Sequence, residues 1–427
     1  MAKLALLGGS AFGALDLPVL HHGFPIYGQE EIDALTEVVR SEDWGTGGPK
    51  QVEFEQAFAE FCGAKYGVMM TNGTHTLKLS MEALGIGPGD EVIVPGSTWQ
   101  ATASSVLDVN AVPVLVDVDP KTWCISPECI EKAITSRTKA IIPVHLYGRM
   151  CDMDAILKIA KKYNLKVIED CAHQHGSEWK GMRAGTMGVV GSFSLQCSKI
   201  MQTGEGGICV TNDEDLYNRL YALKFCGRPR EKGLVTMQSG NFRANEFAAA
   251  IGLCQLARLE EQNTLRHKNV TFLEDALQAE IPGFTYLYRD PRVTKQAHYR
   301  CSMKYNEDAW DGVSRDTIIN AFKAEVMNTE NEKYSVKLVK PYAPLNDSPL
   351  YRPFSKRTHK ICDEYMAAID PARFDIPVIE RMFKKEYIGF DHPMFLGDQK
   401  ELAKVVDVLK KLYDNRGELK KFEAEQQ

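Results

Sequence analysis

The sequence lacks a long hydrophobic run, a paired-cysteine motif and an excess of basic residues, and each absence excludes a class of protein. No apolar stretch approaches the roughly 20 residues of a membrane-spanning helix. The apolar stretch near the N-terminus is broken by Gly8 and Gly9, which makes it too short for a secretory signal. The eleven cysteines include no CxxC pair, so a zinc ribbon and a redox motif are both disfavoured. We therefore expect a cytoplasmic protein with reduced thiols and no membrane partner.

The charge balance and the glycine pattern exclude further classes. The chain carries 51 basic and 57 acidic residues, a formal net charge of −6, and no basic run suited to nucleic acid. We therefore expect no nucleic-acid partner. No GxGxxG stands at a first strand–helix turn, so a nucleotide-binding oxidoreductase is set aside. His173 and His175 lie near Asp170, but no second cluster completes a coordination shell, and we expect no metal.

The first half of the chain alternates between apolar runs and amphipathic segments. The predicted strands are 66–70, 91–95, 113–117, 140–145, 166–169, 189–194 and 207–210. The predicted helices include 74–84, a segment opened by Ser126, Pro127 and Glu128, and 153–163. This alternation predicts an α/β protein with a mostly parallel sheet covered by helices.

The pattern changes in the second half. A long helical stretch at 245–277 is followed by proline-rich loops, a strand at 298–305 and helices at 316–322 and 399–413. A length of 427 residues is enough for two domains. We predict a large domain at 1–256 and a smaller α+β domain at 257–427.

A lysine and an acid carry the strongest chemical signal. Lys199 follows an apolar run in GSFSLQCSKIMQTGEGG, and Asp170 ends another in KVIEDCAHQHG. Residues at the ends of neighbouring strands in such a fold face one crevice. A lysine can form an imine with the aldehyde of pyridoxal 5′-phosphate (PLP), and a carboxylate keeps its pyridine nitrogen protonated. The pair therefore predicts a PLP enzyme.

Other strand ends offer groups that suit the same cofactor. Gly73 and Thr74 open a helix in TNGTHTL, where free amide groups favour phosphate, although an ordinary capped helix has the same pattern. Trp99 could stack on a ring, although buried tryptophan is more often core. Ser194 ends the strand before Lys199, and its hydroxyl could reach a phosphate. The combination is more specific than any one part.

Long, ordered motifs make the chain resemble the DegT/StrS-type aminotransferases of sugar and aminocyclitol biosynthesis, which are PLP enzymes of fold type I. The matching segments cover most of the chain and include GPGDEVIVPGSTWQATASSV, PVLVDVDPKTWCISP, VIEDCAHQHG, GSFSLQCSKIMQTGEGG and NFRANEFAAAIGLCQL. A dehydratase branch of the family has histidine at the imine position, so Lys199 argues for amino transfer. A PLP-fold protein that acts as a regulator without catalysis is the alternative from another class.

The resemblance implies a role for each matching position. It makes Lys199 the imine-forming lysine and Asp170 the partner of the pyridine nitrogen. The implied phosphate contacts are Gly73, Thr74 and Ser194, and Trp99 is the implied stacking residue. These residues together would bind the cofactor.

Three more positions follow from the resemblance. His173 stands where many members carry glutamine, near the cofactor hydroxyl, and Gln196 stands where others carry histidine or glutamine. Asn241 resembles an asparagine that reaches the phosphate of a neighbouring subunit. We therefore expect a homodimer with shared active sites.

The C-terminal motifs YAPLNDSPLYRP and FDHPMFLGDQKELAKVVDVL resemble the branch that acts on inososes and related cyclitols or on aminohydroxybenzoate precursors. We expect a keto-cyclitol acceptor such as scyllo-inosose or its 2-deoxy form, with a phosphorylated or nucleotide-linked keto sugar as the alternative. Glutamine and glutamate both remain open as amino donor. His145, Tyr147 and the loop that begins at Trp44 are candidate substrate contacts, and packing of their loops is an equal alternative.

Overall fold

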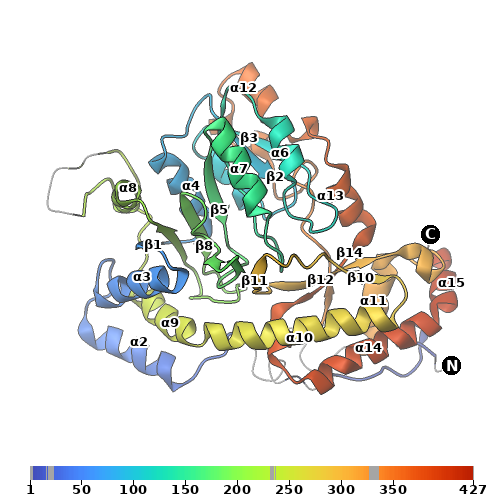
Figure 1. Ribbon diagram of the computed structural model, residues 1–427. Helices are drawn as coiled ribbons and strands as arrows, with labels where there is room; N and C mark the ends of the chain where they lie inside the picture. Colours follow the sequence, from blue (N-terminus) through green and yellow to red (C-terminus); the bar gives the residue numbers. More distant parts are fainter. Residues whose placement is uncertain are drawn as a thin grey trace.

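The structure is a computed structural model that describes residues 3–15, 17, 24–230, 235, 237–326 and 336–426. Figure 1 shows a large body that contains the main sheet, with a smaller body below and to its right. The long helix α10 (Leu259–Glu280) runs along the lower side of the molecule between the two parts. The active-site residues predicted above fall mostly on the main sheet.

The main sheet has seven strands in the order β1-β9-β8-β5-β4-β2-β3. They are β1 (Tyr66–Met70), β2 (Glu91–Pro95), β3 (Val112–Val116), β4 (Thr138–Ile141), β5 (Lys166–Asp170), β8 (Val190–Ser194) and β9 (Gly207–Thr211). Only β9 runs against its neighbours, so β1, β8, β5, β4, β2 and β3 share one direction. The predicted mostly parallel α/β sheet is confirmed. Its strands are buried on both faces, as their continuous apolar runs require.

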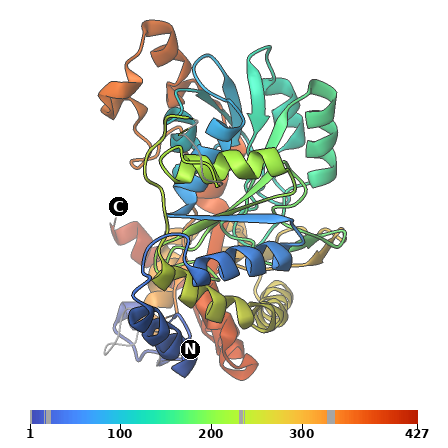
Figure 2. The same ribbon diagram turned by 90° about the vertical axis from the view of Figure 1, so that its left-hand side faces the viewer.

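Helices cover both faces of this sheet. They are α3 (Pro49–Cys62), α4 (Gly73–Ala83), α5 (Ala101–Leu107), α6 (Pro127–Ala133), α7 (Met153–Tyr163), α8 (Glu214–Lys224) and α9 (Glu246–Ala257), and α2 (Gln29–Ser41) packs against α9. Figure 2 shows β1 between α8 on one side and α3 on the other. Ser126 caps α6 by accepting the Cys129 N–H, and Pro127 takes the first helical position, as predicted. No helix in the described ranges is long and apolar enough to cross a bilayer.

The helical stretch predicted at 245–277 is divided in the structure. Helix α9 ends at Ala257 and α10 begins at Leu259, with Arg258 as the shared cap between them. The sequence offered no glycine or proline at this point to mark the break. The two helices can therefore follow different directions, one along the main sheet and one along the second body.

A second, antiparallel sheet has the order β10-β12-β14-β13. Its strands are β10 (Phe284–Tyr286), β12 (Arg300–Tyr305), β13 (Leu338–Val339) and β14 (Tyr387–Asp391), and β11 (Val293–Lys295) pairs separately with β6 (Glu178–Trp179) and β7 (Met182–Arg183). The remaining α-helices are α11 (Arg315–Val326), α12 (Asp363–Ala368), α13 (Pro377–Arg381), α14 (Gln399–Asp414) and α15 (Arg416–Gln426). Helices α10, α11 and α14 pack with this sheet in a second core.

Two segments pack outside the sequence range to which they were assigned. Side chains near the N-terminus join the core of the second sheet: Leu4, Leu15 and Leu17. Side chains of the proline-rich segment join the core of the main sheet: Leu345, Tyr351, Tyr365 and Ile369. The division at 256/257 falls next to the α9–α10 junction and stays a prediction. The second segment matters for function because it brings residues over the carboxyl edge of the main sheet.

Candidate active site

A cavity of about 500 Å³ lies at the carboxyl edge of the main sheet. Eight residues predicted to bind a cofactor line it: Gly73, Thr74, Trp99, Asp170, His173, Ser194, Gln196 and Lys199. Each follows or ends one of the parallel strands β1, β2, β5 and β8, so the fold brings them to one edge. A cavity of this size is typical of sites for small molecules.

Asp170 is the last residue of β5 and is 6% exposed. Its Oδ2 accepts a hydrogen bond from the Thr102 hydroxyl at 2.9 Å, and its Oδ1 accepts from the Ala172 backbone N–H at 3.2 Å. Burial raises the pKa of the carboxyl, while these two hydrogen bonds and the charge of Lys199 oppose that rise. The protonated ring nitrogen of a ligand bound in the cavity would find a fixed hydrogen-bond acceptor in the Asp170 carboxylate.

Lys199 lies in the turn after β8 and is 8% exposed. Its Nζ is 4.8 Å from the centroid of the Tyr299 ring. Burial lowers the pKa of the amine to about 8, with the charge of Asp170 opposing the change and that of Arg300 adding to it. A lysine with a lowered pKa has more of its amine in the neutral, nucleophilic form near neutral pH.

Two buried histidines hold the backbone around this lysine. His175 Nε2 donates to the Ser194 carbonyl at 2.9 Å, and His392 Nε2 donates to the Ser198 carbonyl at 3.0 Å. Burial lowers the pKa of His175 to about 3 and that of His392 well below its usual range, so both rings are neutral. The turn that carries Lys199 is thus fixed from the main sheet and from the second body.

The start of α4 forms a cradle for an anion. Asn72 caps the helix by accepting the His75 N–H at 2.9 Å. Gly73 and Thr74, whose backbone N–H groups have no partner within the helix, line the cavity. A Cβ on residue 73 would lie 2.8 Å from the Cβ of Ser194, so only glycine permits this approach. Helix dipole, free amides and two hydroxyls fit a phosphate group.

Trp99 and His173 contribute aromatic rings to the cavity wall. Trp99 is 46% exposed, which argues against the alternative that it is simple core. His173 stacks on Tyr299, with ring centroids 3.9 Å apart. Its Nδ1 accepts the Tyr147 backbone N–H at 3.2 Å, so the proton is on Nε2, which faces the Tyr342 hydroxyl at 3.4 Å. Burial keeps the His173 pKa well below its usual range, and the ring is a neutral donor.

Several cavity residues were not found from the sequence. Thr98 and Thr102 follow β2, while Tyr299, Arg300 and Tyr342 come from the second body and the segment after β13. The strand predicted at 298–305 was correct in kind, but nothing in its pattern placed it against the main sheet. The usable signal for a site was the sequence HYR at 298–300, because a histidine, a tyrosine and an arginine stand next to one another at the start of the predicted strand.

Four predicted positions lie away from the cavity wall. Asn241 is exposed, and its Oδ1 accepts from Arg243 Nε at 2.8 Å. Trp44 is 51% exposed and donates from Nε1 to a backbone carbonyl. His145 and Tyr147 are buried, and Tyr147 Oη accepts the Tyr342 backbone N–H at 2.7 Å. For these last two the geometry favours packing, and their role as substrate contacts stays a prediction.

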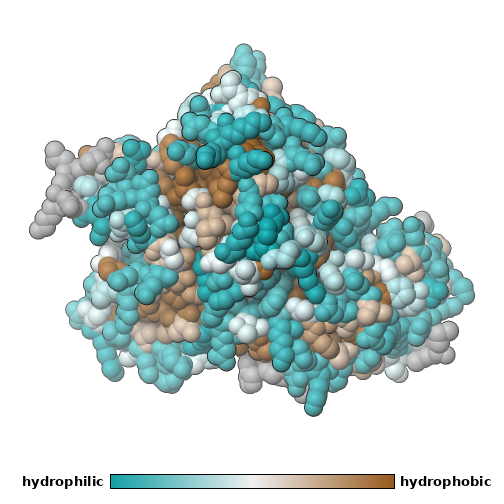
Figure 3. Space-filling view, in the orientation of Figure 1, coloured by the Kyte–Doolittle hydropathy of each residue, from teal (hydrophilic) through white to brown (hydrophobic). Residues whose placement is uncertain are grey.

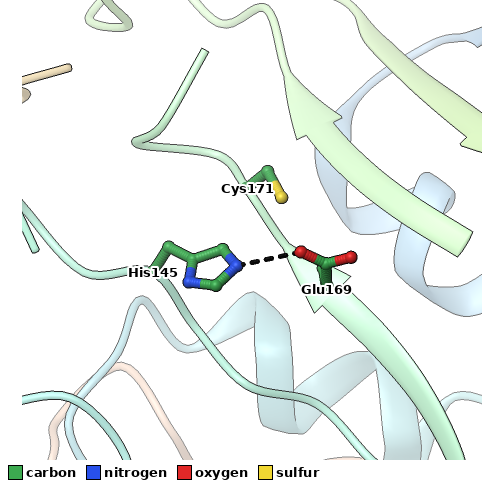
Figure 4. Close-up of side chains that lie close together, drawn as sticks. All are labelled: His145, Glu169 and Cys171. Atoms are coloured by element: carbon green, nitrogen blue, oxygen red, sulfur yellow. Dashed lines mark hydrogen bonds and ion pairs between the residues drawn. The ribbon is translucent and has the colours of Figure 1, made fainter. Parts of the chain in front are cut away.

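His145, Glu169 and Cys171 lie close enough together to suggest a metal site, and Figure 4 shows them. His145 Nδ1 accepts the Cys151 backbone N–H at 3.1 Å, so Nε2 carries the proton and donates to Glu169 at 3.1 Å. Glu169 also accepts three backbone N–H groups from residues 185, 187 and 188. Both ring nitrogens and the carboxylate are thus already engaged, which favours a structural hydrogen-bond network over a metal centre.

A cavity that combines a buried amine, a buried carboxylate and an anion cradle at the edge of a parallel sheet fits pyridoxal 5′-phosphate, and the protein is a PLP-dependent enzyme. The model of the DegT/DnrJ/EryC1/StrS aminotransferase family matches residues 25–367. The chain therefore belongs to this family and is an aminotransferase, which confirms the resemblance found in the sequence.

Similar proteins extend the match over nearly the whole chain. A protein of Streptomyces kanamyceticus, provisionally assigned as an L-glutamine:3-amino-2,3-dideoxy-scyllo-inosose aminotransferase, is 39% identical and covers 98% of both chains. An L-glutamine:2-deoxy-scyllo-inosose aminotransferase of Streptoalloteichus tenebrarius is 37% identical over 94% of this chain and 97% of its own. The crystal structure of 3-amino-5-hydroxybenzoic acid synthase is 31% identical, covers 93% and 98%, and has a TM-score of 0.79.

Proposed function

We propose that this aminotransferase moves an amino group from L-glutamine to a keto-cyclitol of the scyllo-inosose type. The observation that carries the proposal is the full-length similarity to relatives named for glutamine and for inososes, at 35–39% identity. The acceptor would be scyllo-inosose, its 2-deoxy form or an amino-substituted form. All of these are compact polyhydroxylated rings with one ketone.

The charges on the cavity wall favour a cyclitol over a nucleotide-linked keto sugar. Among the described residues that line the cavity, the cationic side chains are Lys199 and Arg300. A cofactor phosphate already needs the cradle of α4. The diphosphate of a nucleotide-linked sugar would bring two more negative charges, and any charge that enters the cavity needs a partner. A neutral ring asks only for hydrogen bonds, which the hydroxyl-rich wall supplies.

The lining residues suit distinct tasks toward the cofactor. When bound, PLP supplies an electron sink that makes the substrate Cα–H bond acidic. Asp170 would hold a proton on the ring nitrogen, and Thr102 would keep that carboxylate oriented. Lys199 Nζ, with its lowered pKa, would accept and return the proton at the substrate carbon.

Five more residues would position the cofactor. Gly73, Thr74 and Ser194 would bind the phosphate, and Trp99 would cover the ring. His173 would donate from Nε2 to the ring hydroxyl. That proton is on the nitrogen beside the Tyr342 hydroxyl, another group of the cavity wall, so histidine can replace the amide donor of a glutamine at this position.

A homodimer with shared sites is part of the proposal. Helix α9 is apolar on nearly all sides, and a helix of this kind is normally buried. Figure 3 shows hydrophobic residues gathered on the surface where α3 and α9 lie. Asn241 is exposed just before this helix together with its partner Arg243, so a neighbouring subunit could contact it. We further propose a cytoplasmic location, since all eleven cysteines carry free thiols.

A panel of acceptors tests the proposal. The enzyme in its amino-loaded form is mixed with scyllo-inosose, 2-deoxy-scyllo-inosose, 3-amino-2,3-dideoxy-scyllo-inosose and a nucleotide-linked 3-keto sugar. Return of the cofactor spectrum to the aldehyde form reports amino transfer. We expect at least one inosose to react faster than the nucleotide sugar. A preference for the nucleotide sugar would overturn the cyclitol assignment, and an inert colourless protein would favour a regulator.

A further inference from the structure

We propose that Arg300 binds the α-carboxylate of the amino donor and so separates recognition of the donor from recognition of the acceptor. The proposal rests on the donor half of the function above, that an α-amino acid enters this cavity. It does not depend on which keto compound accepts the amino group.

The guanidinium of Arg300 is fixed in place. It extends from the first residue of β12, and its side chain is 13% exposed. Nε donates to Asp391 Oδ1 at 2.9 Å, and Nη1 donates to the Lys340 carbonyl at 3.1 Å. These two bonds set the plane of the group, which still lines the cavity. A positioned fork of N–H donors suits a carboxylate.

Aromatic rings surround this cation. Its central carbon lies 5.0 Å from the Tyr147 ring centroid, 5.5 Å from that of Tyr342 and 5.8 Å from that of Tyr299. The same Tyr299 ring lies 4.8 Å from Lys199 Nζ, so the two cations are neighbours across one tyrosine. An anion bound at Arg300 would therefore share one cavity with the amine of Lys199.

The charges of the cavity residues favour Arg300 as the group that binds the donor carboxylate. Lys199 is committed to the cofactor, and Asp170 to the ring nitrogen. His173 is neutral, since burial keeps its pKa well below the usual range. Among the described lining residues, the charges that remain are those of Arg300 and Glu205, and Arg300 keeps its guanidinium at the cavity although its Nε pairs with the half-exposed Asp391. A donor carboxylate entering this partly buried space needs a positive partner, because an unpaired buried charge is very costly.

The amino donor and the keto acceptor differ in negative charge. Glutamine carries an α-carboxylate, whereas a keto-cyclitol has hydroxyl groups and no negative charge. Both must place a reacting carbon beside Lys199 in turn. A cation at Arg300 would bind the donor strongly and would make only ordinary hydrogen bonds to the acceptor. Loss of its charge should then affect the two half-reactions unequally.

Two unreactive probes measure the carboxylate contact directly. Glutaramate is glutamine without its amino group, and glutaramide replaces the carboxylate by a neutral amide. Calorimetric titration of the PLP-loaded enzyme gives the Kd of each. We expect wild type to prefer glutaramate, and Arg300→Gln to weaken glutaramate at least about 30-fold while changing glutaramide little. Arg300→Lys should keep part of the preference, because the charge remains but the fork is lost.

A matched control is Arg381→Gln, which removes an arginine from a half-exposed ion pair with Glu386 outside the cavity. It should leave both Kd values unchanged. Half-reactions should show a large loss with glutamine and a small one with the cyclitol in Arg300→Gln. Equal binding of the two probes by wild type overturns the proposal without any variant. An equal loss of both probes in Arg300→Gln also overturns it, as a general packing defect. Failure of every cyclitol in the acceptor panel leaves the probe result intact and refutes only the acceptor.

Discussion

Gly73 and Ser194 approach so closely that a single methyl group at position 73 would lie 2.8 Å from the Ser194 Cβ and 3.1 Å from its Cα. One residue opens helix α4, and the other ends strand β8. Their contact joins the helix start to the strand whose next turn carries Lys199. The proposed phosphate cradle and Lys199 are therefore held together by direct packing.

Gly73→Ala should widen this contact and weaken the cofactor site. Overpacking of this kind costs about 1–3 kcal/mol, and it moves the first amides of α4 away from the phosphate. We expect a lower melting temperature and about a tenfold or greater rise in the Kd for PLP. The control Gly417→Ala adds a methyl group to α15 where no atom lies within 4 Å. An unchanged PLP affinity in Gly73→Ala would contradict the assignment of Gly73 to the phosphate site.

Lys199→Ala should abolish turnover while the fold survives. The amine is lost, but the strand ends and the cradle of α4 remain, so the variant should still bind PLP through the phosphate. Circular dichroism and thermal melting check the fold, and absorbance reports the bound cofactor. Lys166→Ala, at an exposed position, is the control. Turnover at the wild-type rate in Lys199→Ala would refute the assignment.

The same lysine should make the cofactor-free enzyme less stable at neutral pH. Its pKa is about 8 in the folded protein against an ordinary 10.5, so the unfolded chain binds more protons between these values. Lys199 therefore opposes folding fully below pH 8, and this effect fades as the pH rises toward 10.5. Lys199→Met should raise the free energy of unfolding at pH 7 by about 3 kcal/mol. Denaturant titrations at pH 7 and 10 should show the gain shrinking, and a constant gain would contradict it.

The sequence predicted the main sheet well because its strands are continuous apolar runs with clear ends. The ranges 66–70 and 91–95 for strands and 153–163 for a helix match the structure. The strand predicted at 140–145 instead ends at Ile141. Its apolar pattern continues, but Pro143 has no N–H for the ladder, and the chain leaves the sheet there.

Candidate site residues were predictable where one strand end determined them. Asp170 and Lys199 needed only the order of elements along the chain. Arg300 and Tyr342 reach the cavity from the second body, across a contact between segments distant in sequence. Local periodicity carries no information on such a contact, and their discovery required the structure. The three tyrosines around Arg300 come from separate parts of the sequence, and only Tyr299 belongs to the strand predicted at 298–305.

Asp170→Asn should keep the shape of the site and remove its charge. Thr102 can still donate to the remaining oxygen, but the ring nitrogen would lose the partner that keeps it protonated. We expect the donor half-reaction to slow about 100-fold or more, with a smaller loss of PLP affinity. Single-turnover absorbance measures the rate. Asp117→Asn is a matched control, because Asp117 is also buried but accepts backbone N–H groups at the start of α13. This substitution should lower the stability of the protein without slowing the donor half-reaction of the PLP-loaded enzyme.

Removal of metal ions should leave the enzyme unchanged. Internal hydrogen bonds already engage the ring nitrogens of His145 and the carboxylate of Glu169, and burial raises the pKa of the Cys171 thiol well above its usual range. A thiol that resists ionisation is a poor ligand. Prolonged dialysis against EDTA should alter neither the melting temperature nor turnover. A stoichiometric metal in the purified protein, lost together with activity on dialysis, would contradict this expectation.

The assembly prediction concerns Asn241, which is exposed and lies outside its own cavity. If it completes the phosphate site of a neighbouring subunit, PLP binding and dimer formation are linked, because a ligand that binds the dimer stabilises it by mass action. PLP should then raise both the melting temperature and the dimer fraction. Asn241→Ala should weaken both effects. Ser239→Ala, two residues away, is a control for disturbance of the loop.

Mixed dimers give the decisive measurement. One chain carries Lys199→Ala and the other carries Asn241→Ala, with different affinity tags so that heterodimers can be isolated. If the asparagine acts across the interface, one site of the heterodimer combines both defects, and the other combines an intact Lys199 with an intact neighbouring Asn241. Activity should therefore return to a level above either parent homodimer, since one complete site is rebuilt. If Asn241 served its own chain, each site of the heterodimer would keep the single defect of its parent, and the activity would equal the average of the two parents. Isolated heterodimers that show no recovery would place Asn241 in its own subunit's site or in none.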